Sequence, residues 1–177
     1  MTTSGSTNFE PNVTEFIEEA YERCGLELRT GYDLKSALRS VNIMLAEWAN
    51  RGLNQWTIDQ STQTVTQGTY DYALNSNVID VLDVVVRRTV NNIQTDISMS
   101  RLSRSEYLNI PNKETQARPS QFFLDKSITP VLKVWPAPEN STDVIVFNKI
   151  IRMDDADAAD NTMDMPFRFF PCFTAGL

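Results

Sequence analysis

The sequence contains no histidine, and this absence limits the chemistry open to the chain. Without imidazole there is no Ser-His-Asp or Cys-His nucleophile pair and no His-ligated zinc. Cys24 and Cys172 are far apart and lack metal or redox spacing, so we expect two buried free thiols. Only 6 glycines are present, none in GxGxxG or GxxxxGK spacing. Most hydrolase mechanisms are therefore excluded, and we expect neither a cofactor nor a metal.

Long apolar runs and an excess of positive charge are also missing. No stretch approaches the ~20 apolar residues that cross a bilayer, and the start MTTSGSTNF lacks the features of a signal peptide. We therefore expect synthesis in the cytoplasm and no membrane partner. The net charge of −7 predicts that the chain repels the phosphate backbone rather than reading its sequence. The 177 residues, 41% of them hydrophobic, allow one domain or two small ones.

Two helices are predicted within residues 11–52, after a Thr/Ser/Gly-rich flexible arm at residues 1–10. Asn12 and Glu15 have the spacing of a capping box, apolar residues recur at helical spacing from Val13 to Cys24, and Gly25 ends the run. A second start signal at Thr30 and Asp33 opens a helix of about 20 residues, roughly 30 Å long. Gly52 and Leu53 predict a Schellman motif at its end.

The apolar period changes from 3.6 to 2 after this helix, which predicts a β-rich insert over residues 53–151. Strands are indicated at QFFLD, VLKVW and DVIVFNKII, and around Val84–Val86. Residues 78–83 fit either a strand or a helical turn. Ser103 and Glu106 predict one short helix near residues 103–109. The expected fold is a small antiparallel β-sandwich or barrel inserted into the helical part.

Residues 152–164 are acidic and lack apolar periodicity, which predicts an exposed loop or linker carrying Asp154, Asp155, Asp157, Asp160 and Asp164. A calcium loop starting at Asp155 fails because Ala159 and Pro166 occupy ligand positions. Pro166 then opens an aromatic helix that completes the helical part with residues 165–177. Because this helix stops without a polar cap, we expect the sequence to be a fragment.

Two charged groups admit a functional interpretation. The first helix carries glutamates that could serve a glycoside hydrolase, although they lie opposite its apolar face, as solvated residues do: Glu15, Glu18, Glu19 and Glu22. Basic residues gather in the middle of the chain, where they form either a surface for an acidic partner or ordinary surface charges: Arg87, Arg88, Arg101, Arg104, Lys113 and Arg118. The sequence leaves the second choice open.

Five segments together resemble the head-to-tail adaptor proteins of tailed bacteriophages, especially short-tailed ones. They are NVTEFIEEAYERCG, LRSVNIMLAEWANRGLNQW, ISMSRLSRSEYLNIPNKETQARPSQFF, ITPVLKVWPAPEN and MPFRFFPCFTAGL. The resemblance covers nearly the whole chain in order. It implies an α+β fold in which a long-helix bundle carries the inserted antiparallel β-sandwich or small barrel.

The resemblance implies a structural protein of the virion neck rather than an enzyme. The subunit would form a ring with copies of itself, a dodecamer, that docks on the portal protein and provides the platform for the tail tube or nozzle protein. DNA would pass through the ring without sequence-specific binding. Aromatic and arginine anchors would form the interfaces, and the candidates are Trp48, Arg51, Trp56, Trp135, Phe167, Phe169, Phe170 and Phe173. The alternatives are a virion-associated peptidoglycan hydrolase that uses carboxylates and a receptor-binding tail module.

Overall fold

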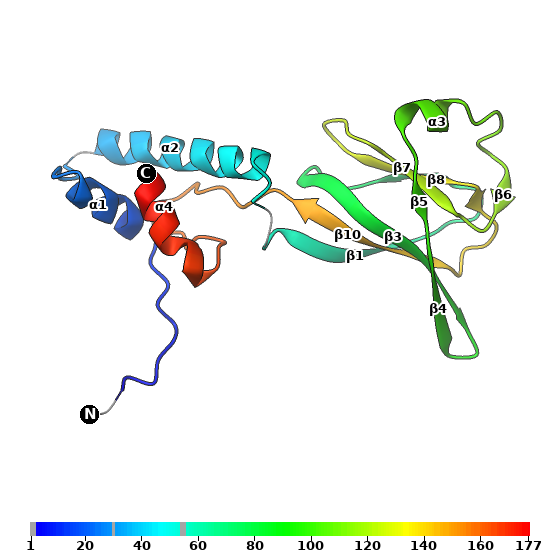
Figure 1. The fold of residues 1–177 in the computed structure, drawn as a ribbon, viewed down its shortest axis with the longest axis horizontal. Helices are drawn as coiled ribbons and strands as arrows, with labels where there is room; N and C mark the ends of the chain where they lie inside the picture. The colour runs from blue at the N-terminus through cyan, green and yellow to red at the C-terminus, as the bar shows by residue number, and fades with distance from the viewer. Residues whose placement is uncertain (1–2, 30, 54–55) are drawn as a thin grey trace. The chain divides into compact units, whose positions relative to one another are not determined.

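The computed structural model describes residues 3–29, 31–53 and 56–177. The chain divides into two compact units, which we call the helical unit (Met1–Trp56 with Met153–Leu177) and the β unit (Thr57–Arg152). The described residues form four α-helices, a short 3-10 helix and ten strands (Figure 1). The fold is therefore α+β.

Helix α1 (Val13–Arg23) begins and ends at the predicted signals. The Asn12 side chain accepts the Glu15 N–H, and the Glu15 carboxylate accepts the Asn12 N–H, both at 2.9 Å. At the other end Gly25 has a φ of 71°, and the Leu26 N–H donates to the Tyr21 carbonyl at 2.9 Å. The capping box and the glycine stop are confirmed, and the stop is a Schellman motif.

Helix α2 (Gly31–Asn50) is the one long helix among the described residues. Its predicted start signal at Thr30 lies outside them. Gly52 has a φ of 81°, its N–H donates to the Ala49 carbonyl, and the Leu53 N–H donates to the Trp48 carbonyl, both at 3.1 Å. These two hydrogen bonds confirm the predicted Schellman motif.

The predicted long-helix bundle is wrong. The C-terminal segment forms a 3-10 turn, η1 (Phe167–Phe169), and then the 7-residue helix α4 (Phe170–Gly176). Pro171 explains the break between them, since it cannot donate the backbone hydrogen bond that one continuous helix from Phe167 would require. The core is completed instead by Met153 and Ala156 of the non-helical segment, which are both buried with α1, α2 and α4.

The β unit contains two four-stranded sheets and a short strand pair. The first sheet has the order β1 (Ile58–Thr64), β10 (Val144–Ile151), β3 (Val78–Val90), β4 (Ile93–Ser98), with every pair antiparallel. The second has the order β2 (Asp71–Ala73), β8 (Val131–Trp135), β7 (Gln121–Asp125), β5 (Ser100–Arg101). The third pair is β6 (Gln116–Ala117) with β9 (Ala137–Pro138).

Both large sheets contribute to one buried cluster. Its members include Val84 and Val86 from β3, Phe147 from β10, Phe122 from β7 and Leu132 from β8. The pairs β5–β7 and β6–β9 are parallel, so the second sheet is mixed and the β unit as a whole is not purely antiparallel. The strands predicted at QFFLD, VLKVW and DVIVFNKII are confirmed, whereas the sandwich or barrel stays a prediction.

The ambiguous stretch at residues 78–83 belongs to strand β3. Its register against β10 shifts twice: Phe147 pairs with Val84 but Lys149 pairs with Val81, and Ile150 pairs with Asp80 but Ile151 with Val78. Each shift places one extra residue in β3, so the buried side chains fall three residues apart instead of two. Two bulges therefore produce the period that resembles a helical turn.

Two short motifs of the β unit follow local signals in the sequence. Asn91 and Asn92, with φ values of 51° and 61°, form the two-residue turn that joins β3 to β4. The predicted short helix is confirmed as α3 (Arg104–Leu108). Its capping box is complete, because the Glu106 N–H donates to the Ser103 hydroxyl and the Ser103 N–H donates to the Glu106 carboxylate.

Candidate functional site

Five of the predicted interface aromatics belong to one cluster in the helical unit. The Trp48 ring lies 6.3 Å from Phe173 and 6.5 Å from Phe169, and Trp56 lies 4.4 Å from Phe169. Phe170 joins the cluster through Phe16 on α1, with their ring centroids 5.0 Å apart. Trp48, Trp56, Phe169, Phe170 and Phe173 are thus mutual packing partners, and their role in an interface stays a prediction.

The other three candidates are placed differently. Phe167 is 64% exposed, and its ring meets only the edge of Phe9 and the ring of Phe170 among the aromatic pairs of the described residues. Arg51 is exposed and forms an ion pair with Glu47 one turn earlier. Trp135 lies half-buried in β8 of the β unit, and its Nε1–H donates to the Asn112 carbonyl at 3.1 Å. Of the eight, Phe167 therefore presents the barest apolar surface.

Phe167 borders an open groove of about 470 Å³ on the helical unit. Apolar side chains from residue 9, α1 and the C-terminal segment line it: Phe9, Pro11, Phe16, Phe167, Phe170 and Pro171. Glu15, Glu19 and Arg23 of α1 line the groove as well. A groove lined by apolar side chains together with a few charged ones is typical of protein contact sites, which makes this groove the strongest candidate site on the helical unit.

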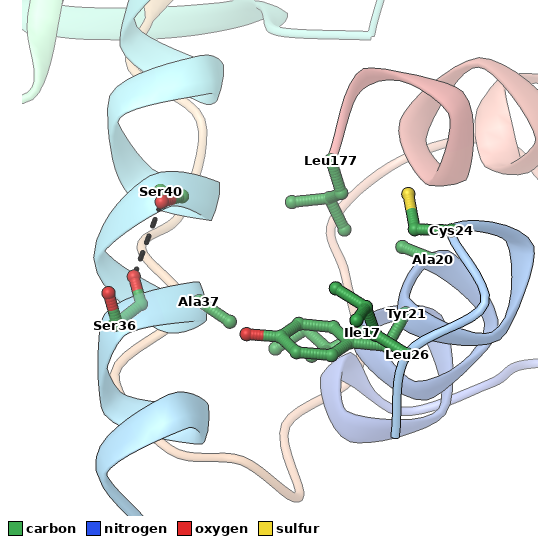
Figure 2. A pocket seen from close by; sticks show the side chains of 9 residues that line it. All are labelled: Ile17, Ala20, Tyr21, Cys24, Leu26, Ser36, Ala37, Ser40 and Leu177. Atoms are coloured by element: carbon green, nitrogen blue, oxygen red, sulfur yellow. Dashed lines mark hydrogen bonds between the residues drawn. The ribbon is translucent and has the colours of Figure 1, made fainter. Parts of the chain in front are cut away.

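A second, smaller pocket of about 260 Å³ lies between α1 and α2 (Figure 2). Tyr21 and Ile17 enter it from α1, Ala37 lines it from α2, and Leu177 borders it. The Ser40 hydroxyl on α2 is occupied, because it donates to the Ser36 carbonyl at 3.3 Å. Its described lining residues include no carboxylate and no basic side chain, so they supply no acid/base pair.

The acidic segment is attached to the helical unit by its backbone. The Ala156 N–H donates to the Asn42 side chain at 2.9 Å, and that side chain donates back to the Ala156 carbonyl at 3.1 Å. The carbonyls of Asn161 and Ala159 accept the N–H groups of the first two residues of α1 at 2.9 and 3.1 Å. The segment thereby caps α1, whose first N–H groups have no partner within the helix.

Its five aspartates are all exposed: Asp154, Asp155, Asp157, Asp160 and Asp164. Four of them line an open hollow of about 650 Å³, where partial burial and the nearby Asp154 raise the pKa of Asp164. Among the described residues, no group of three His, Cys, Asp or Glu side chains is arranged to hold a metal ion. The segment therefore presents an acidic surface from a backbone that is hydrogen-bonded to α1 and α2.

Most of the central basic residues pair within the β unit. Arg88 bonds Asp143 at 2.7 Å, Arg87 bonds Asp96 at 2.7 Å, and Arg101 bonds Asp80 at 2.8 Å. Arg104 bonds Asp125 at 2.8 Å, and the Lys113 ammonium donates to the Ile110 carbonyl at 3.1 Å. Of the two interpretations that the sequence leaves open, these pairs favour ordinary intramolecular charges over a surface for an acidic partner.

Two further expectations are affected by the structure. Cys24 and Cys172 are free thiols but exposed, so the predicted burial is wrong: Cys24 follows the last turn of α1, and Cys172 lies in α4. The glutamates of α1 are exposed as predicted, with Glu15 held in the capping box and Glu19 paired to Arg23.

The feature that sequence reasoning missed is the long β3–β4 hairpin. Its signal was present in TVNNIQT, because two asparagines between apolar residues favour a two-residue hairpin turn. Asparagine is the residue that most readily takes a positive φ after glycine. The hairpin presents Val90 and Ile93 to solvent, 56% and 69% exposed.

Comparison with known proteins identifies the family of the chain. No helix among the described residues is both long and apolar enough to cross a membrane. No curated protein matches the sequence. The family described as SU10 adaptor protein matches residues 11–176, which include all the helices and strands of both units. The chain therefore belongs to the SU10 adaptor protein family of bacteriophage structural proteins, and its resemblance to head-to-tail adaptors is confirmed.

Proposed function

We propose that this chain is the subunit of a head-to-tail adaptor ring. In this proposal twelve copies dock on the phage portal protein, in the virion neck, and provide the platform for the tail tube or nozzle protein. The single observation that carries it is the family match over residues 11–176, which leaves neither unit outside the adaptor family. The subunit would act by binding and would need no cofactor.

Its surfaces support a binding role. The groove beside Phe167 is lined largely by apolar side chains, and a side chain of the portal or of the tail could fill it. The exposed aspartates of the acidic surface suit a protein that stands close to moving DNA without holding it, since like charges repel. We place the aspartates toward the channel on this ground.

The test is the native mass of the purified protein, alone and mixed with the portal ring of its phage. The expected result is a discrete complex that holds one copy of this chain for each portal subunit. Portal rings that keep their original mass beside free protein would refute the proposal. A matched pair of variants adds detail: Phe167→Ala should weaken the complex, whereas Leu108→Ala, which removes a similarly exposed apolar side chain in α3 of the β unit, should leave it unchanged.

The hydrolase alternative is separated by one assay. Purified protein is incubated with peptidoglycan, and release of soluble fragments is measured for the wild type and for variants of each α1 glutamate. An adaptor releases no fragments in any of them. Release that disappears with one glutamate substitution would establish the enzyme instead.

A further inference from the structure

The first sheet of the β unit has two free edges. Just after β4, the Met99 N–H donates to the Val84 carbonyl at 2.9 Å, and this bond fixes the alternation of the ladder. Gln94, Asp96 and Ser98 of β4 therefore direct their backbone N–H and C=O groups away from β3. Just before β1, the Thr57 carbonyl accepts the Ile151 N–H at 2.8 Å, so Gln60 and Thr62 of β1 direct their backbone groups away from β10. Among the described residues, no other strand pairs with either edge.

These edges lack the devices that usually prevent edge-to-edge pairing. Their sequences, IDQSTQT and IQTDIS, contain no lysine, arginine or proline. Their two carboxylates are matched by cations on the inner strands, Asp59 by Lys149 at 3.3 Å and Asp96 by Arg87 at 2.7 Å. The edges of the second sheet are different, because β2 and β5 are only 3 and 2 residues long.

Strand direction favours a second copy of this chain as the partner. The four strands pair antiparallel at every step, so the edge strands β1 and β4 run in opposite directions. Two copies placed side by side in the same orientation would therefore bring β4 of one against β1 of the next as an antiparallel pair. Such a contact joins two different surfaces and can repeat from copy to copy, which is the kind of interface a ring requires.

The hairpin carries a further sign of contact. Val84 and Val86 lie on the face of β3 that is buried in the core, and the same face continues through Arg88, which pairs with Asp143, to Val90 near the turn. Ile93 is the cross-strand partner of Val90, and both are more than half exposed. Two neighbouring apolar residues exposed at a hairpin tip form a small patch that another surface can cover. In Figure 1 this ribbon projects from its sheet.

We propose that copies of this chain join by strand addition, with β4 of one copy pairing to β1 of its neighbour so that the first sheets form a continuous band. Main-chain hydrogen bonds would give the affinity, and the hairpin tip would bury Val90 and Ile93 against the neighbour. The proposal rests on the proposed function, because it supplies the contact between subunits of the ring.

Proline substitutions test the two edges separately. Gln94→Pro and Thr62→Pro each remove one N–H that faces outward, while the ladder bonds to β3 and β10 do not use that N–H. Ala73→Pro is the matched control, since Ala73 is exposed and its N–H also faces outward, but on the edge of the second sheet. The native mass of each full-length protein is measured over a range of concentrations, without the portal ring and on it.

The wild type and the control should form the same multimers, and each edge variant should need a concentration about tenfold higher or more. Mixing the two edge variants should give dimers at most, since only one competent pair of edges then remains. Edge variants that assemble like the wild type, or a wild type that is monomeric in every condition, would overturn strand addition. Should either proline variant lose its fold by circular dichroism, Gln94→Lys and Thr62→Lys replace them.

The two proposals fail in different ways. If the wild type forms multimers that do not bind the portal ring, the adaptor role is refuted and the edge pairing still stands. If both edge variants bind the portal ring in the same number of copies as the wild type, strand addition is refuted and the adaptor role still stands.

Discussion

Replacing Arg88 by methionine should destabilise the β unit by about 2–3 kcal/mol at neutral pH. The Asp143 side chain is only 3% exposed, and Arg88 binds it with two nitrogens, Nε to Oδ1 at 2.9 Å and Nη2 to Oδ2 at 2.7 Å. Removing one partner of a buried pair costs about 3–5 kcal/mol. We expect the smaller loss of about 2–3 kcal/mol here for two reasons. The Asn140 amide also donates to Asp143, at 3.2 Å, and Arg88 itself is partly exposed.

The loss of stability in Arg88→Met should depend on pH. Hydrogen bonds from Arg88 hold the pKa of Asp143 below its usual range, so the pair stabilises the fold above that range, and the stability is lost as pH falls through the lowered pKa. In Arg88→Met the carboxyl group loses this partner, and its pKa should rise. The difference in stability between the two proteins should therefore be largest near pH 7 and shrink below about pH 4.

The stability of the β unit by itself is measured by urea unfolding, with hydrogen exchange of peptides from β10 as the readout. The double variant Arg88→Met, Asp143→Asn should recover much of the loss, because no buried charge is then left without its cation. An equal loss at pH 3 and pH 7, or a double variant worse than the single one, would refute the assignment of the effect to a buried ion pair.

Three smaller predictions concern the helical unit, each measured by urea unfolding. Phe173→Ala should cost about 3–5 kcal/mol because the ring is fully buried, whereas exposed Phe167→Ala should cost under about 1 kcal/mol; equal losses would contradict the packing described. Asn42→Ala should cost about 2 kcal/mol and speed hydrogen exchange in the acidic segment, since two buried backbone groups lose their partner; unchanged exchange would contradict this. Gly52→Ala should cost about 1 kcal/mol through its positive φ, and Gly31→Ala should stabilise by a few tenths, as neither methyl group would meet a clash; effects of the same sign would rule this out.

Local signals in the sequence predict the ends of the helices well. Asn12 with Glu15, and Ser103 with Glu106, form the capping boxes that their spacing indicates, and Gly52 ends α2 as expected. These motifs succeed because each is satisfied within four or five residues of its own position. The aromatic residues of the cluster could be picked out as candidate contact residues, but their pairings with one another could not, since Trp56 and Phe169 meet only through the tertiary fold.

Features that depend on distant partners were beyond local reasoning. The bulges in β3 exist only relative to β10, so the three-residue period of Val78, Val81 and Val84 could not be told from a helical turn. The acidic segment gave no apolar period, yet Asn42, on a helix more than a hundred positions earlier, supplies the hydrogen bonds that fix it. The composition of such a segment predicts its charge but not the distant residues that hydrogen-bond its backbone.

The capping of α1 by the carbonyls of Ala159 and Asn161 has a consequence for synthesis. The β unit is continuous in the chain, whereas the helical unit is divided between the two ends of the sequence. At roughly 5–20 residues per second, a ribosome needs about 5–20 s after releasing α2 to reach the segment that completes its core. During that interval α1 and α2 carry an uncovered apolar face while the β unit can already fold, so the helical unit closes after the β unit.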